Sequence, residues 1–176
     1  CMALGDMAKN SIRMGTGRVV TKEEALAIAE QNEGDGLVLQ PSNTQKVEFV
    51  CACCGCCCGM LGIQKVLPKP VDFWSSSYYA SVEKKACTGC GRCKERCQVN
   101  AVFIDNGCHV AVVNLDRCIG CGNCVASCPM GAMSLLEKEQ VLVPPTDTQA
   151  LYDTIMANKQ GTLGKIKLAA RLIFKK

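Results

Sequence analysis

Hydrophobic residues recur at helical spacing in two segments near the start of the chain. The first predicted helix covers residues 2–13, where apolar positions return every three or four residues before glycines end the pattern. The second begins after Thr21, which forms a capping box with Glu24, and it ends near Gly34. A short strand is expected at 37–40, just before a proline.

A single pattern of elements occurs twice in the middle of the chain. Segments 87–104 and 118–135 each run from a cysteine-rich loop through a short helix to an apolar strand. The link between them reads as a strand, a turn at Asn106–Gly107 and a second strand. With a further strand near 79–83, this duplicated β-α-β pattern predicts an α+β fold.

Residues 138–176 form a predicted linker and helical tail. Thr146 or Asp147 is expected to cap a helix after two prolines. The final segment, 163–176, has five positive charges, no acidic residue and an apolar side, so we expect a helix that docks on a partner. Contact of this helix with a membrane surface is the alternative.

Composition changes this picture mainly through cysteine, which accounts for 16 of the 176 residues. A secreted disulfide scaffold is one explanation, but no secretory signal and no membrane-length apolar stretch is visible, so a reducing cytoplasm is expected. The chain starts at Cys1 rather than at methionine, which suggests either a processed protein or a fragment whose upstream part is missing.

Eight of the cysteines fall into the runs CTGCGRCKERCQ at 87–98 and CIGCGNCVASCP at 118–129. This doubled spacing is typical of two [4Fe–4S] clusters, in which three cysteines of a run hold one cluster and the fourth serves the other. The doubled spacing argues against zinc or simple core packing. The first predicted ligand set is Cys87, Cys90, Cys93 and Cys128, and the second is Cys118, Cys121, Cys124 and Cys97. Glycines between the ligands are expected to let the backbone fold tightly and point N–H groups at the sulfurs.

These runs resemble the bacterial two-cluster ferredoxin family. The resemblance implies a ferredoxin-like fold over 72–137 and one-electron transfer as its function. It divides the chain into a helical cysteine-rich segment at 1–71, the ferredoxin-like domain at 72–137, and a linker with a helical tail at 138–176. Gln98 stands where the family usually has proline, and we expect this difference to shift one cluster's potential without preventing assembly.

A third group of cysteines, in the sequence CACCGCCC, precedes the ferredoxin-like runs. Neighbouring side chains of an extended chain point to opposite sides, so this group is expected to serve two different sites. We predict at least one further iron–sulfur cluster here, with Cys1 as a candidate ligand and other ligands supplied by a missing upstream part or a partner. Zinc or redox-active thiols are the alternatives. The candidate residues are Cys1, Cys51, Cys53, Cys54, Cys56, Cys57 and Cys58.

All but the tail of the chain resembles a family of larger anaerobe 4Fe–4S-binding proteins that carry this upstream CxCCGCCC motif. In that family a further cysteine motif, and often a part like a helix-turn-helix, precedes the position of Cys1. The resemblance does not reveal a physiological partner.

Net charge gives little support for nucleic-acid binding. The formal value is +4, but each oxidised cluster with its thiolates carries about −2, which brings the total close to zero.

The leading functional hypothesis is a single-electron relay within an anaerobic oxidoreductase. No nucleotide fingerprint or nucleophile constellation is present, so a flavin or nicotinamide site would belong to a partner subunit. The alternatives are a redox-sensing regulatory protein and an enzyme with a catalytic cluster at the N-terminal cysteines. We expect Cys108 to be a small core thiol rather than an extra ligand, and His109 to be a surface or core residue without a catalytic role.

Overall fold

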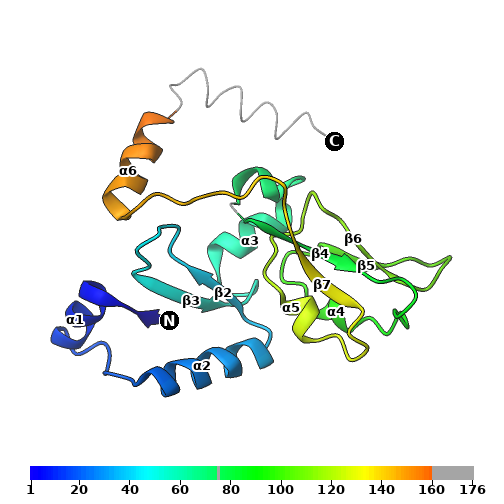
Figure 1. The fold of residues 1–176 in the computed structure, drawn as a ribbon, viewed down its shortest axis with the longest axis horizontal. Helices are drawn as coiled ribbons and strands as arrows, with labels where there is room; N and C mark the ends of the chain where they lie inside the picture. Colours follow the sequence, from blue (N-terminus) through cyan, green and yellow to red (C-terminus); the bar gives the residue numbers. More distant parts are fainter. Residues whose placement is uncertain (75, 160–176) are drawn as a thin grey trace.

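The computed structural model describes residues 1–74 and 76–159 (Figure 1). In chain order the elements are β1 (Met2–Ala3), α1 (Gly5–Arg13), α2 (Lys22–Gly34), β2 (Val38–Pro41), β3 (Phe49–Cys53), α3 (Gly59–Val66), the 3-10 helix η1 (Pro70–Phe73), β4 (Tyr78–Val82), α4 (Arg92–Arg96), β5 (Val102–Ile104), β6 (Ala111–Val113), α5 (Asn123–Ala126), β7 (Met133–Glu137) and α6 (Thr148–Ala157).

The N-terminal part contains a small antiparallel sheet in the order β1-β3-β2. Met2 lies opposite Val50 on β3, so the prediction of a helix over 2–13 is wrong at its start. The backbone N–H of Leu4 donates to the carbonyl of Glu48 at 2.7 Å, and Gly5 turns the chain with φ +56°. The helix α1 therefore begins only at Gly5, because pairing with β3 holds the preceding residues extended.

Two predicted helices are confirmed together with their caps. Thr21 Oγ1 accepts the N–H of Glu24 at 3.2 Å and the Glu24 carboxylate accepts the N–H of Thr21, which completes the capping box of α2. Asp147 caps α6 by accepting the N–H of Ala150 at 2.9 Å. The predicted docking helix at 163–176 lies outside the described residues and stays a prediction.

The cysteine-rich runs lie between two separate antiparallel strand pairs, β4-β7 and β5-β6. β4 and β7 pair along five residues, from Tyr78 opposite Glu137 to Val82 opposite Met133. The short helices α4 and α5 lie within the two runs and contact each other, and α4 also contacts β5 while α5 contacts β7. Each run thus includes a short helix that packs against one of the strands (Figure 1).

The connection between β5 and β6 is a wider loop than the predicted Asn106–Gly107 turn. The carboxylate of Asp105 accepts the N–H groups of Gly107 at 2.9 Å and Cys108 at 2.7 Å, and its carbonyl accepts the N–H of His109. Cys108 is exposed in this loop, so the expectation that it is a core thiol is wrong. His109 is also exposed, as a surface residue.

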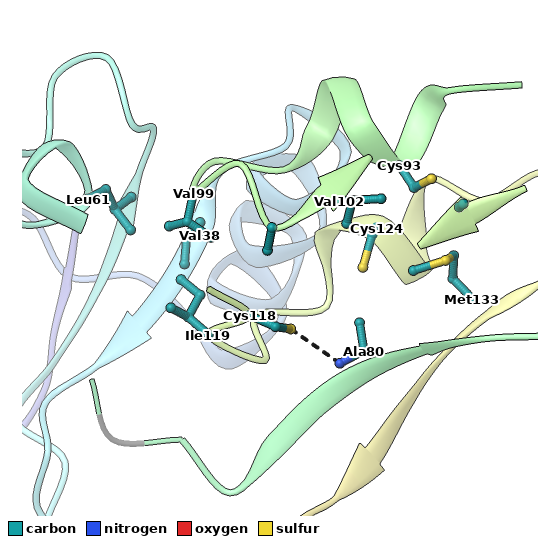
Figure 2. Packing of buried hydrophobic residues seen from close by; sticks show 12 residues of the cluster. Val38, Leu61, Ala80, Cys93, Val99, Val102, Cys118, Ile119, Cys124 and Met133 are labelled. Carbon is teal, nitrogen blue, oxygen red and sulfur yellow. Dashed lines mark hydrogen bonds between the residues drawn. The ribbon is translucent and has the colours of Figure 1, made fainter. Parts of the chain in front are cut away.

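One hydrophobic core joins the N-terminal part to the cysteine-rich repeat (Figure 2). Val38 and Leu61 come from the N-terminal side, and both are almost completely buried. They meet Val99 and Ile119 of the repeat, and the core continues to Met133. Residues on both sides of the expected boundary between 71 and 72 therefore contribute to the same packed interior. Within 1–74 and 76–159, no helix is both long enough and apolar enough to cross a bilayer.

Candidate metal centres

The eight cysteines of the two runs gather around two cavities. The first cavity is lined by Cys87, Cys90, Cys93 and Cys128, and the second by Cys97, Cys118, Cys121 and Cys124. Each cavity takes three cysteines from one run and its fourth from the other run. These are the two groups into which the sequence analysis divided the cysteines.

Local structure explains why the fourth cysteine of each run crosses to the other cavity. Cys93 lies in the first turn of α4 and Cys124 in that of α5. Each therefore lines the same cavity as the two cysteines of the loop before its own helix. Cys97 and Cys128 come just after the same two helices. Because α4 and α5 contact each other, the end of each helix lies close to the loop of the other run.

Two of the glycines between the cysteines are required by close backbone contacts. Gly89 and Gly120 have φ angles of +67° and +66°, which L residues adopt only at a cost in energy. A side chain at Gly89 would collide with the carbonyl oxygen of His109, and one at Gly120 with that of Tyr78. The tight loop folding expected from the sequence is therefore present at both sites.

Backbone N–H groups donate to a sulfur in each cavity. Ala111 donates to Cys87 Sγ at 3.3 Å in the first cavity. In the second, Ala101 donates to Cys97 Sγ at 3.1 Å and Ala80 to Cys118 Sγ at 3.3 Å, the bond drawn in Figure 2. These donors belong to strands or their ends, whereas the sequence analysis expected donors from the glycine loops. Nothing in the sequence marks these alanines as N–H donors to the ligand sulfurs.

Burial raises the proton affinity of three of the thiols when no metal is present. It raises the pKa of Cys93 and Cys121, and it raises the pKa of Cys124 to about 12 with help from neighbouring thiols. Burial also acts to raise the pKa of Cys128, but N–H groups of Met130 and the residues after it lower that pKa overall. Metal binding at these sites must therefore displace thiol protons.

The donor set fits a [4Fe–4S] cluster at each cavity. Each offers four sulfur atoms, which favour iron–sulfur clusters or other thiophilic metals, and N–H groups that stabilise negative charge on sulfur. The surroundings are apolar, with Val102 and Ile119 buried beside the second cavity and Met133 beside the first. Such surroundings keep water away from a bound cluster.

The structure divides the N-terminal cysteines into two groups. Cys51, Cys53 and Cys58 line a separate cavity of about 720 Å³. Outside it, the sulfur atoms of Cys54, Cys56 and Cys57 lie within 4.8 Å of one another. Cys54 and Cys56 are joined as a disulfide, and Cys54 Sγ lies 3.2 Å from Cys57 Sγ. Cys1 is exposed at the start of the chain, next to β1.

The thiols in the larger cavity differ in proton affinity. Burial, and then the neighbouring Cys58, raises the pKa of Cys53. The pKa of Cys58 is lowered, chiefly by the N–H of Leu61, because Cys58 caps the amino end of α3.

Arg117, next to Cys118, is an organising residue that the sequence analysis missed. Its guanidinium donates to four backbone carbonyls at 2.7–3.1 Å. The acceptors are Val99, Leu67, Gln64 and Lys65. Three of them belong to the end of α3, so Arg117 ties this helix to the loop of the second cavity.

The amides of Gln98 and Asn123 connect the second cavity to the N-terminal part. Gln98 Oε1 accepts the N–H of Gly55 at 2.9 Å, and its Nε2 donates to the carbonyl of Gly36 at 3.1 Å. The buried Asn123 donates to the same carbonyl at 2.8 Å. Gln98, which replaces the expected proline, thus has a structural role. No local pattern predicts bonds between residues 43 to 87 positions apart.

Comparison with known proteins identifies the repeat. The family described as the 4Fe-4S dicluster domain matches residues 86–140, a range that contains all eight cysteines of the two cavities. No curated protein matches the chain. The match does not extend to the N-terminal sheet or its cysteines.

Proposed function

We propose that this chain, which carries a 4Fe–4S ferredoxin-type domain at 86–140, moves single electrons between two [4Fe–4S] clusters as part of an anaerobic oxidoreductase. The observation that carries the proposal is the interleaving of the ligands. Each of two adjacent cavities is lined by three cysteines of one run and one cysteine of the other run. This sharing fixes two centres close together, which suits a relay.

In this proposal Cys87, Cys90, Cys93 and Cys128 hold the first cluster, and Cys97, Cys118, Cys121 and Cys124 hold the second. The clusters supply the one-electron chemistry, and the chain supplies position and surroundings. Ala80, Ala101 and Ala111 direct N–H groups at ligand sulfurs, which raises the reduction potential by stabilising added negative charge.

The fold around these clusters is proposed to be a duplicated ferredoxin-like arrangement of the bacterial type over 72–137. The two runs with their helices α4 and α5 form the repeated units, and the strand pairs β4-β7 and β5-β6 flank them. The segments 1–71 and 138–176 are then additions to this domain, and the first of them packs on it through the shared core.

The two cluster sites differ in their access to a partner. Cys90 at the first cavity is exposed, whereas Cys118 and Cys124 at the second are buried. Electrons are therefore expected to enter or leave at the first site, where a partner subunit with a flavin or nicotinamide site would dock on the loop around Cys90.

Iron analysis and EPR of single-cysteine variants test the ligand sharing. Under anaerobic conditions Cys97→Ala should disturb the same EPR signal as Cys121→Ala, although Cys97 lies in the other run. Cys93→Ala should disturb a different signal, and each variant should lose about four irons at most. The exposed Cys108 provides the control, since Cys108→Ala should keep the wild-type spectrum. If Cys97→Ala instead matches Cys93→Ala, the interleaved assignment is wrong.

A further inference from the structure

We propose that Cys1, Cys51, Cys53 and Cys58 hold a third iron–sulfur cluster in the large cavity beside Cys121. This inference rests on the function proposed above, because the third cluster would exchange electrons with the second cluster, of which Cys121 is a ligand. The remaining N-terminal cysteines, Cys54, Cys56 and Cys57, form the separate group outside the cavity and are not ligands of this cluster.

The register of the N-terminal sheet places three of the four ligands on one face. Side chains alternate along β3, so Phe49, Cys51 and Cys53 share a face, and all three line the cavity. Met2 of β1 lies opposite Val50. Continuing this antiparallel register by one residue sets Cys1 opposite Cys51, on the same face of the sheet.

The fourth ligand returns to the cavity after the tight loop that follows β3. The N–H of Cys58 donates to the carbonyl of Cys54 at 3.1 Å, which closes this loop. Cys58 is the N-cap residue just before α3, and it lines the cavity together with Cys51 and Cys53. The crowded sequence CACCGCCC therefore sends both cysteines of β3, and the residue just before α3, to a single site.

The opposite wall of the cavity belongs to the loop of the second ferredoxin cluster. Ile119, Gly120 and Cys121 line the same cavity as the N-terminal cysteines. A sulfur ligand of the second cluster thus lies at the boundary between the two sites. One electron can pass from the second site to the third, oxidising one and reducing the other by a single electron, and no bond forms or breaks.

The surroundings favour an iron–sulfur cluster over a zinc ion. Four thiolates suit either metal, so the ligands alone do not decide between them. Part of the cavity wall is apolar and includes Phe49, Phe73 and Trp74, as expected for an insulated redox centre. The cavity also borders Cys121, so a redox-active group there could exchange electrons with the second cluster, whereas a zinc ion is redox-inert.

Iron and acid-labile sulfide analysis of the anaerobically purified chain provides the test. We expect about twelve irons in the wild type and about eight in Cys53→Ser and Cys58→Ser, with both ferredoxin-type EPR signals retained. Cys57→Ser is the matched control, since this neighbouring cysteine lies outside the cavity, and it should keep about twelve. A Cys1→Ser variant that also keeps about twelve overturns the four-ligand set.

The wild type itself gives a second measurement that does not depend on how the variants fold. Alkylation mapped by mass spectrometry should modify the exposed Cys57 and Cys108, and it should reach Cys51, Cys53 and Cys58 only after a chelator removes the metal. Equal modification of all five before chelation overturns the proposal.

The outcomes separate this inference from the proposed function. Eight irons with two ferredoxin-type signals would overturn the third cluster and leave the relay intact, and one zinc per chain beside eight irons would do the same. Fewer than about eight irons in a wild type reconstituted with iron and sulfide would contradict the relay itself.

Discussion

At the scale of single residues, Arg117 shows how a charged side chain organises the second cluster site without being a ligand. It is half-buried, and its guanidinium serves carbonyls at the end of α3 and at Val99. The carbonyls of Gln64, Lys65 and Leu67 lack an N–H partner within the helix, because α3 ends at Val66. Arginine fits this position because its planar fork presents several donors at once.

We expect Arg117→Gln to lower the free energy of unfolding by about 2 kcal/mol, because several carbonyls lose a charged donor. Anaerobic thermal unfolding should show a fall in Tm of roughly 4–8 °C. Arg13→Gln is the control, since Arg13 is exposed and, among the described residues, its side chain bonds Asn10 of its own helix alone. An equal Tm for the two variants would mean that the Arg117 bonds contribute nothing to stability.

A second residue-scale prediction compares two glycines of the cluster loops. Both Gly91 and Gly120 have positive φ, but the space at Gly91 is open while a side chain at Gly120 would strike the Tyr78 carbonyl. Gly91→Ala should cost only about 1–2 kcal/mol of backbone strain and keep both clusters. Gly120→Ala should push the loop away from β4 and lose about four irons. Iron analysis decides, and full iron content in Gly120→Ala would contradict the close contact.

At the scale of elements, Gln98 links the end of α2 and the loop after β3 to the second cluster site. The amide oxygen of Gln98 accepts the N–H of Gly55, and its amide nitrogen donates to the carbonyl of Gly36. The N–H of Gly55 therefore depends on a side chain 43 positions away for its hydrogen bond.

Gln98→Leu should free the loop around Gly55, because it removes both bonds at similar side-chain size. Hydrogen exchange followed by mass spectrometry should show faster exchange of the peptide that contains Gly55. Gln98→Glu keeps the acceptor and loses the donor, so it should protect Gly55 as well as the wild type does. Unchanged exchange in the leucine variant would show that the loop is held by other contacts. Both variants should keep their iron.

The elements also show how far the sequence determines the structure. The capping box of Thr21 and the grouping of the eight ferredoxin-type cysteines were predictable, because both depend on short, fixed spacings. The strand Met2–Ala3 was not, because its extended form comes from pairing with β3 nearly fifty residues later. The exposed position of Cys108 likewise depends on how Asp105 binds the loop, and periodicity does not show this.

The division of the N-terminal cysteines illustrates the same limit. Alternation along a strand predicted that neighbouring cysteines face opposite sides. It did not predict that Cys58 returns to the side of Cys51 and Cys53, nor that the second ferredoxin-type loop forms the other wall of their cavity. Both facts depend on tertiary packing through Leu61 and Ile119.

At the scale of the whole molecule, the proposed cluster ligands are also core residues. Cys93, Cys118 and Cys124 are each 7% exposed and pack in the same core as Val38 and Leu61 (Figure 2). A bound cluster would therefore fix the interior to which the N-terminal part and the repeat both contribute. Cluster binding and folding should be coupled across the entire described chain.

Removing the metal tests this coupling. Treatment with a chelator and an oxidant should unfold the N-terminal part together with the repeat, because Val38 and Leu61 lose the packed partners on which their burial depends. The circular dichroism signal of the helices should be lost in one transition. Limited proteolysis should then cut near the exposed Gly34 and in the exposed loop around Cys108 at similar rates. In the intact protein the capped helix α2 should be protected. If α2 stays protected after the clusters are lost, then the N-terminal part folds on its own, and the shared core is a contact between two independent units rather than one cooperative interior.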